Sequence, residues 1–219
     1  MKNIAIDGPA GAGKSTIARL VAQRLGYIYV DTGAMYRAEA LACVRAGVSP
    51  DDEESVCRVC GRSRVSLSYE NGEQAVILDG ENVNALIRDE NVSLATSKIA
   101  AYARVREMLL ALQREIASEN NVIMDGRDIG TSVLPGADLK IYLTASVETR
   151  AKRRYTEYVK KGIGCDISEI KKDIAARDER DINREISPLK MADDAVLIDS
   201  SEMTIEEVCD AIISLEEQL

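Results

Sequence analysis

Short apolar runs alternate along the chain with longer segments in which apolar residues recur every three or four positions. The first long segment, residues 14–25, has this helical spacing and stops at Gly26, a favourable helix terminator. The next helix is expected to have Thr32 as its N-cap and to run to about Arg45. Strands that alternate with helices predict a parallel sheet. The pattern therefore predicts an α/β fold: a five-stranded parallel sheet with helices on both faces. The five expected strands cover 4–6, 27–30, 121–124, 139–143 and 195–198.

A different pattern interrupts this series between residues 46 and 90. Residues 49–61 are expected to form a helix that Ser49 caps, with Pro50 at its first position. Residues 64–69 then alternate between apolar and polar. Such a hairpin-bearing segment inside a series of βα units is typical of an insertion.

The hairpin is predicted by its turn as well as by its strands. Asn71-Gly72 is a favoured two-residue turn, and residues 75–78 return as the second strand. Beyond it, residues 91–118 read as one continuous helical pattern. Three more helices are expected: a basic one that Ser146 caps, a charged one over 167–184, and a last one that begins at the Thr204/Glu207 capping box.

Composition limits the possible functions. The 219 residues are 46% hydrophobic, which suits one domain with insertions or at most two. A net charge of -9 argues against a broad nucleic-acid-binding face, so an anionic ligand must meet a local basic cluster. Neither a secretion signal nor a run of about 18 apolar residues is found, and we expect a cytoplasmic protein without a membrane segment.

Cysteine and histidine usage narrows the chemistry further. The five cysteines are an odd number, and Cys57 with Cys60 forms CxxC without a second such pair. We interpret this pair as buried apolar residues on one helix face and not as a metal site. Because the chain has no histidine, catalysis must depend on carboxylates, lysine, arginine and a metal ion.

The strongest motif follows the first strand. Residues 8–15 match GxxxxGK[ST], in which glycines let backbone N–H groups wrap a polyphosphate while the following helix points its positive end at it. Lys14 would reach the β- and γ-phosphates, and the Ser15 hydroxyl would bind Mg²⁺. A plain strand-to-helix turn is the alternative. The predicted nucleotide contacts are Gly8, Pro9, Ala10, Gly11, Ala12, Gly13, Lys14, Ser15 and Thr16.

A second group of residues suits a second phosphate, because arginines provide planar cationic donors. They lie at the ends of elements or on charged helices. Arg177, Asp181 and Arg184 could equally form salt bridges along a solvated helix face. Asp125, after an apolar strand, either faces the metal or caps the next turn. The arginines in question are Arg37, Arg106, Arg127, Arg177 and Arg184.

Five stretches together closely resemble the bacterial cytidylate kinases, a family of nucleoside monophosphate kinases with a P-loop. They are GPAGAGKST (8–16), DTGAMYR (31–37), DGRDIGT (125–131), RDERDINR (177–184) and ISPLKMADDAVLIDSS (186–201). The resemblance covers nearly the full length. It implies a P-loop core (1–45, 91–149 and 189–219), an acceptor-binding insertion (46–90) and a helical lid (150–188).

The resemblance also implies a reaction and roles for individual residues. ATP, with Mg²⁺, would phosphorylate CMP or dCMP, and the enzyme would act as a monomer. Lys14, Arg127 and Arg184 would be catalytic. Arg153 and Arg154 would cover the ATP phosphates from the lid. In the acceptor site, cytosine would be surrounded by Thr32, Ser97, Arg106 and Asp128. The acceptor phosphate would be bound by Arg37, Arg127 and Arg184. The ribose would be bound by Arg177 and Asp181.

Two rival functions stay open at this point. One is a kinase for another small acceptor, such as adenylate or shikimate. The other is a P-loop switch that hydrolyses GTP slowly, but that function needs a guanine-reading NKxD-type segment, which the sequence lacks.

Overall fold

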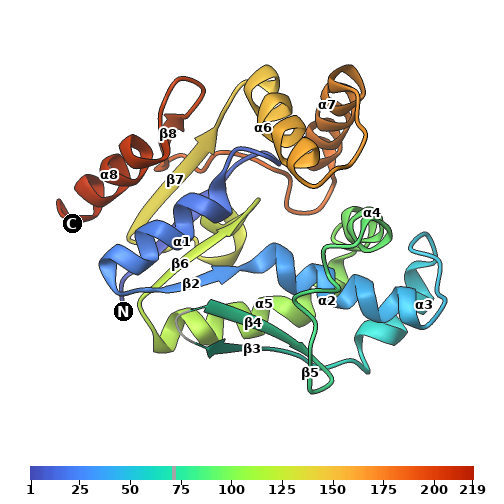
Figure 1. The fold of residues 1–219 in the computed structure, drawn as a ribbon. Helices are drawn as coiled ribbons and strands as arrows, with labels where there is room; N and C mark the ends of the chain where they lie inside the picture. The colour runs from blue at the N-terminus through green and yellow to red at the C-terminus, as the bar shows by residue number, and fades with distance from the viewer. Residues whose placement is uncertain (71–72) are drawn as a thin grey trace. The chain divides into compact units, whose positions relative to one another are not determined.

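The computed structural model describes residues 1–70 and 73–219 (Figure 1). The predicted Asn71-Gly72 turn lies outside these residues. The chain divides into two compact units. Unit 1 comprises Met1 and Ile28–Val122, and unit 2 comprises Lys2–Tyr27 and Ile123–Leu219.

The predicted five-stranded parallel sheet is confirmed. Its central strand carries Ile4, Ala5 and Ile6, which are fully buried. A strand covered on both faces needs such a continuous apolar run. The order in the sheet is β2 (Ile28–Asp31), β6 (Val122–Gly126), β1 (Asn3–Asp7), β7 (Leu139–Thr144) and β8 (Val196–Asp199).

Unit 2 is built around β1 and β7, which run parallel with Ile6 opposite Ile141. Helices α1 (Lys14–Leu25) and α8 (Ile205–Glu216) pack against each other. Their buried faces repeat every three to four residues, as in Ile17 and Val21 of α1. The predicted ends are confirmed: Gly26 ends α1 in a left-handed conformation, and α8 begins with the Thr204/Glu207 capping box.

The two charged helices of unit 2, α6 (Val147–Lys160) and α7 (Ile167–Asn183), pack side by side (Figure 1). They enclose a small apolar cluster of their own, made of Ala151, Ile170 and Ile174. Ser146 caps α6 as predicted, since its hydroxyl accepts from the Thr149 N–H at 3.2 Å.

Unit 1 contains four helices and a three-stranded antiparallel sheet among the residues that are described. The hairpin strands are β3 (Val65–Glu70) and β4 (Glu73–Leu78), and the third strand, β5 (Glu81–Asn82), is too short to predict. Val76 and Leu78 of β4 join the core together with Met35 and Ile99. The helices are α2 (Thr32–Arg45), α3 (Glu53–Cys60), α4 (Glu90–Ile99) and α5 (Ala103–Glu119).

Two predicted helix caps are wrong, one by one residue and the other by three. Asp31, and not Thr32, caps α2, because its carboxylate accepts from the Ala34 N–H at 2.9 Å. Asp52 caps α3 in the same way, so the helix begins at Glu53 and Pro50 lies before it. In both places several residues could act as caps, and an ionised carboxylate is the stronger acceptor.

The single helix predicted over 91–118 is also wrong, because α4 ends at Ile99 and α5 begins at Ala103. Tyr102 has extended backbone angles, and its hydroxyl donates to Pro50 O at 2.9 Å. No glycine or proline marks the break in the sequence. A contact with residues about fifty positions away therefore stabilises a turn that local propensity does not favour.

The CxxC cysteines are buried, which confirms their interpretation as apolar residues. Cys57 and Cys60 lie on α3, and the Cys60 sulfur is 3.9 Å from that of Cys43 on α2. Among the described residues, histidine, cysteine and carboxylate side chains form no group of three that could hold a metal ion. Within that same part of the chain, no helix is long and apolar enough to span a membrane.

The end of β1 gives a stability prediction. Gly8 has φ +146°, and a Cβ there would lie 2.0 Å from the Leu143 carbonyl oxygen. Gly8→Ala should lower the free energy of unfolding by about 3 kcal/mol or more, because the backbone at Leu143 would have to move to make room for the Cβ. Gly26→Ala, at φ +68° with open space around it, is the control and should cost about 1 to 2 kcal/mol. Urea unfolding measures both, and equal losses would contradict the prediction.

Candidate active site

The glycine-rich loop of unit 2 leads from β1 into α1. Gly11 and Gly13 have left-handed φ angles of 79° and 92°. Gly13 occupies the capping position of α1, and no side chain there accepts a hydrogen bond from the first turn. The positive end of the helix is therefore left for an external acceptor, which is the arrangement that an anion such as phosphate requires.

Lys14 lies across this loop. Its ammonium donates to the Pro9 carbonyl oxygen at 2.8 Å, and the residue is buried. Burial lowers the pKa of Lys14 to about 7, and the charge of Arg127 lowers it further while Asp125 and Asp7 oppose the change. An incoming polyphosphate would favour the charged form of this amine.

Ser15 and Asp125 meet at the start of α1. The Ser15 hydroxyl donates to a carboxylate oxygen of Asp125 at 3.0 Å, and Asp125 is buried at the end of β6. Asp125 therefore lies against the phosphate loop. A hydroxyl and a carboxylate are hard oxygen ligands of the kind that Mg²⁺ prefers. Thr16, the last predicted loop residue, is exposed.

Helix α6 presents arginines to the same loop. Arg153 donates to the Ala12 carbonyl oxygen of the loop at 3.2 Å. Arg154 instead donates to the Tyr158 hydroxyl one turn along its own helix. Arg150, which the site prediction omitted, is buried and donates to Ala10 O at 3.0 Å. Its position three residues before Arg153, on the same helix face, was the available signal.

Asp178 of α7 holds Arg150 in place. The carboxylate accepts from both terminal nitrogens of the guanidinium, at 3.1 and 2.6 Å. Such bidentate pairs fix the plane of the guanidinium. The loop, α6 and α7 are therefore linked through one buried arginine.

Two ion pairs connect the segment after β6 with α7 and the residue that follows it. Arg127 donates to Asp181 at 2.9 Å, and Arg184 lies 3.3 Å from Asp128. Burial would raise the pKa of Asp181, but the charge and hydrogen bond of Arg127, with the charges of Arg177 and Arg184, hold it below its usual value. These four residues therefore lie together near the end of β6, and their ion pairs are not confined to the face of one helix.

Asp7 is a further buried carboxylate that the site prediction missed. Its two oxygens accept the backbone N–H groups of Ile129 at 2.8 Å and Gly130 at 2.7 Å. Burial raises the pKa of Asp7 to about 6, although these two hydrogen bonds oppose the change. The signal in the sequence was an acidic residue directly after an apolar strand.

In unit 1, Arg37 and Thr32 lie on the first turns of α2. Arg37 donates to Asp31 at 2.9 Å, and Asp31 also caps the helix. The Asp31 backbone N–H donates in turn to Gln74 of β4 at 2.8 Å. The hairpin sheet thereby fixes the start of α2, and Thr32 is buried there.

Arg106 of α5 is buried, and its surroundings offset the cost of burying its charge. The guanidinium donates to the Ala100 carbonyl oxygen at 3.2 Å and lies over the Tyr36 ring, 5.6 Å from its centre. Tyr36 was not predicted as a site residue. Ser97, which was, lies half-buried on α4.

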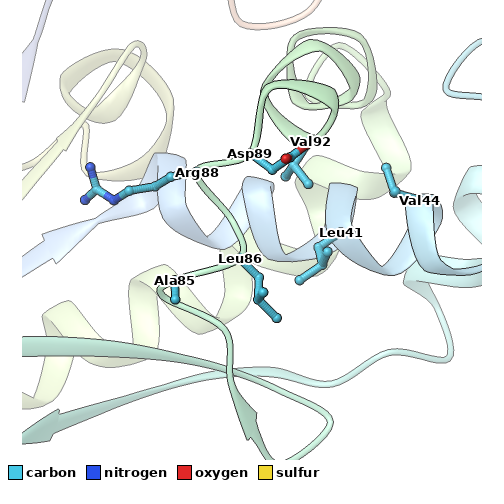
Figure 2. Close-up of a pocket in the computed structure, with 7 residues that line it drawn as sticks. All are labelled: Leu41, Val44, Ala85, Leu86, Arg88, Asp89 and Val92. Atoms are coloured by element: carbon cyan, nitrogen blue, oxygen red, sulfur yellow. The ribbon is translucent and has the colours of Figure 1, made fainter. Parts of the chain in front are cut away.

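Unit 1 also has a groove with a mostly apolar lining. Figure 2 shows apolar side chains of α2 and of the segment before α4 around it, and no predicted site residue lines it. Its lining contains one arginine, Arg88, next to the acidic Asp89, and is otherwise apolar, so it lacks the cluster of cationic groups that the phosphates of a nucleotide would require. The lining residues are Leu41, Val44, Ala85, Leu86, Arg88, Asp89 and Val92.

Comparison with known proteins places the chain in a family. The family model described as cytidylate kinase matches residues 4–218. A cytidylate kinase from Caldicellulosiruptor bescii is 48% identical over 213 residues, which are 97% of this chain and 94% of that protein. One from Geobacter sulfurreducens is 50% identical over 212 residues, covering 97% and 91%.

Solved structures show similarity of fold alone. An uncharacterized protein from Eubacterium ventriosum matches with a TM-score of 0.54 and 12% identity over all of both chains. A shikimate kinase from Bacteroides thetaiotaomicron matches with a TM-score of 0.50 and 14% identity, covering 99% of this chain and 98% of that one. At such identities the shared feature is the fold.

The lowered pKa of Lys14 predicts proton uptake when Mg-ATP binds. At pH 8 an amine with a pKa near 7 is mostly neutral, and the phosphates should raise that pKa, so binding should take up nearly one proton. Affinity should accordingly fall as the pH rises from about 7 towards 10. Calorimetry in two buffers of different ionisation enthalpy measures the uptake. Lys14→Met should abolish it, and equal uptake by both proteins would contradict the assignment.

Proposed function

Since the chain belongs to the cytidylate kinase family, we propose that it transfers the γ-phosphoryl group of ATP to CMP or dCMP, giving ADP and CDP or dCDP. The observation that carries the proposal is the loop of unit 2, in which Lys14 and the Ser15–Asp125 pair lie at an uncapped helix start. This combination suits a nucleoside triphosphate with its metal ion.

The residues present fit both ligands. The loop from Gly8 to Thr16 would bind the ATP phosphates, with Lys14 as their cation and Arg153 near them. The Ser15 hydroxyl and the Asp125 carboxylate would hold Mg²⁺. When bound, the ion supplies charge neutralisation at the β- and γ-phosphates.

Arginines serve the acceptor phosphate in this proposal. Arg37 of unit 1 and Arg127 and Arg184 of unit 2 each already lie beside a carboxylate, which keeps the guanidinium oriented in the absence of phosphate. Lys14, Arg127 and Arg184 would stabilise the charge of the transferring group. Alignment and cationic stabilisation are sufficient, because the acceptor phosphate is itself the nucleophile.

The remaining assignments concern the nucleoside and the moving parts. We assign Thr32, Ser97, Arg106 and Asp128 to cytosine, and Arg177 with Asp181 to the ribose. Residues 46–90 would form the acceptor-binding insertion, and 150–188 a lid over the phosphates that includes Arg154. The separate cluster between α6 and α7 supports the lid, since such a pair can move as one body.

The test of this function is a panel of CMP, dCMP, UMP and AMP at fixed Mg-ATP, with ADP formation as the readout. CMP and dCMP should exceed UMP at least about tenfold in kcat/KM, because uracil would leave buried polar groups mismatched at about 1 to 3 kcal/mol each. Equal use of UMP and CMP would refute the assignment of the base contacts. A preference for AMP would indicate a kinase for another acceptor.

Two arginine variants separate base recognition from phosphate binding. Arg106→Met should narrow the preference for CMP over UMP, since it removes a donor to the base. Arg184→Met should reduce kcat/KM for every acceptor alike, because all of them share the phosphate. An Arg184→Met enzyme that altered only the base preference would reverse these roles.

Lys14→Met tests the donor site. Because Lys14 belongs to the loop and not to the apolar core, the variant should fold but retain less than about a tenth of wild-type turnover, a loss above about 1.4 kcal/mol. Lys2→Met, at an exposed lysine paired with Glu216, is the control and should keep full activity. Turnover is measured by ADP release, and circular dichroism checks the fold. Near-normal turnover by Lys14→Met would rule out the loop as the donor site.

A further inference from the structure

Asp7 lies at the junction of β1 and the phosphate loop in unit 2. It is the last residue of β1, directly before the phosphate loop, and it is buried. Each carboxylate oxygen accepts one backbone N–H, from Ile129 at 2.8 Å and from Gly130 at 2.7 Å. Both donors belong to one turn of π-helix, Ile129–Val133, which follows β6.

A buried carboxylate is costly, and an apolar residue would suit the end of an apolar strand better. The two hydrogen bonds to a charged acceptor offset that cost, and they can form only if the turn lies directly over the strand end. The position therefore favours a side chain with two acceptor oxygens. Asparagine would offer one acceptor and would set its amide donor against the second N–H.

The turn held by Asp7 directly follows residues assigned to the acceptor. Arg127 and Asp128 immediately precede Ile129, and each forms an ion pair, with Asp181 and Arg184 respectively. A displacement of the turn would carry the backbone of both residues with it.

Strand β7 supports the same turn through Lys140. The Lys140 ammonium donates to Pro135 O at 2.6 Å and to Asp194 at 2.7 Å. Its aliphatic part lies so close that a Cβ on Gly130 would be 3.1 Å from the Lys140 Cδ. The neighbouring strands β1 and β7 thus fix both the start and the end of this segment.

We infer that Asp7 is a positioning residue for phosphoryl transfer, which sets the segment carrying Arg127 and Asp128 against the end of β1. The next residue, Gly8, begins the donor loop. One strand end therefore fixes two sets of phosphate-binding groups at once. This inference rests on the proposed function, because it takes Arg127 and Asp128 to be acceptor contacts.

The test is Asp7→Asn, which keeps the volume of the side chain and removes one acceptor. The KM for CMP should rise at least about tenfold and kcat should fall. The dissociation constant of a non-hydrolysable Mg-ATP analogue, measured at pH 6.5 so that Lys14 stays largely charged, should stay within about twofold, since the loop itself is intact. Amide exchange at Ile129 and Gly130, followed by NMR, should accelerate. If Asp7 only stabilised the fold, its replacement would weaken the binding of CMP and of the Mg-ATP analogue by similar factors.

Asp138→Asn is the matched control. Asp138 is also an acceptor for a backbone N–H, that of Asn3 at 2.7 Å, but it is exposed and lies at the opposite end of β1. This variant should leave the kinetics of both substrates unchanged.

If Asp7→Asn does not fold, Gly130→Ala provides a second route. Its Cβ would crowd Lys140 and Asp7 and displace the turn without removing a charge. The KM for CMP should therefore rise, while the dissociation constant of the Mg-ATP analogue should not change. A KM for CMP within twofold of the wild-type value would overturn the inference. So would equal increases in the KM for CMP and in the dissociation constant of the Mg-ATP analogue. Failure of the wild-type enzyme to use CMP would instead refute the proposed function, and the amide exchange measurement would still report on the Asp7 bonds.

Discussion

The carboxyl end of β1 is the constraint on which unit 2 depends. Ile4, Ala5 and Ile6 must be apolar because the strand is buried, yet Asp7 is charged and Gly8 approaches the Leu143 carbonyl so closely that no Cβ fits. Within two residues the chain therefore changes from packing against neighbours to binding polar groups. The phosphate loop and the turn after β6 both start from this point.

Buried charge is the second organising feature, and the structure balances it locally. The chain carries a net charge of -9, yet arginines face the loop and the segment after β6. Three of them pair with carboxylates: Arg150 with Asp178, Arg127 with Asp181, and Arg184 with Asp128. Such pairs offset desolvation, and they keep guanidinium groups oriented for anionic ligands.

Short stretches of sequence were sufficient to predict most of the fold. They failed where more than one residue could cap a helix, and where a distant residue determines a helix end. The five strands, the loop and the Thr204/Glu207 capping box follow from short stretches of sequence. The cap of α2 did not, because Asp31 and Thr32 are both good capping residues, and the position of Asp31 is also set by a tertiary bond, from its backbone N–H to Gln74. The break at Tyr102 depends on Pro50, which no window around residue 102 contains.

The candidate site divides in the same way. The loop from Gly8 to Ser15 is evident from eight consecutive residues, because its chemistry depends on backbone shape and local spacing. The partners of that loop come from far along the chain: Asp125 is 110 residues from Ser15, and Arg150 is 140 from Ala10. A motif can show that a carboxylate or an arginine is needed. Which one supplies the contact depends on how the strands are ordered in the sheet, and that order is a property of the packed core, which no single stretch of sequence contains.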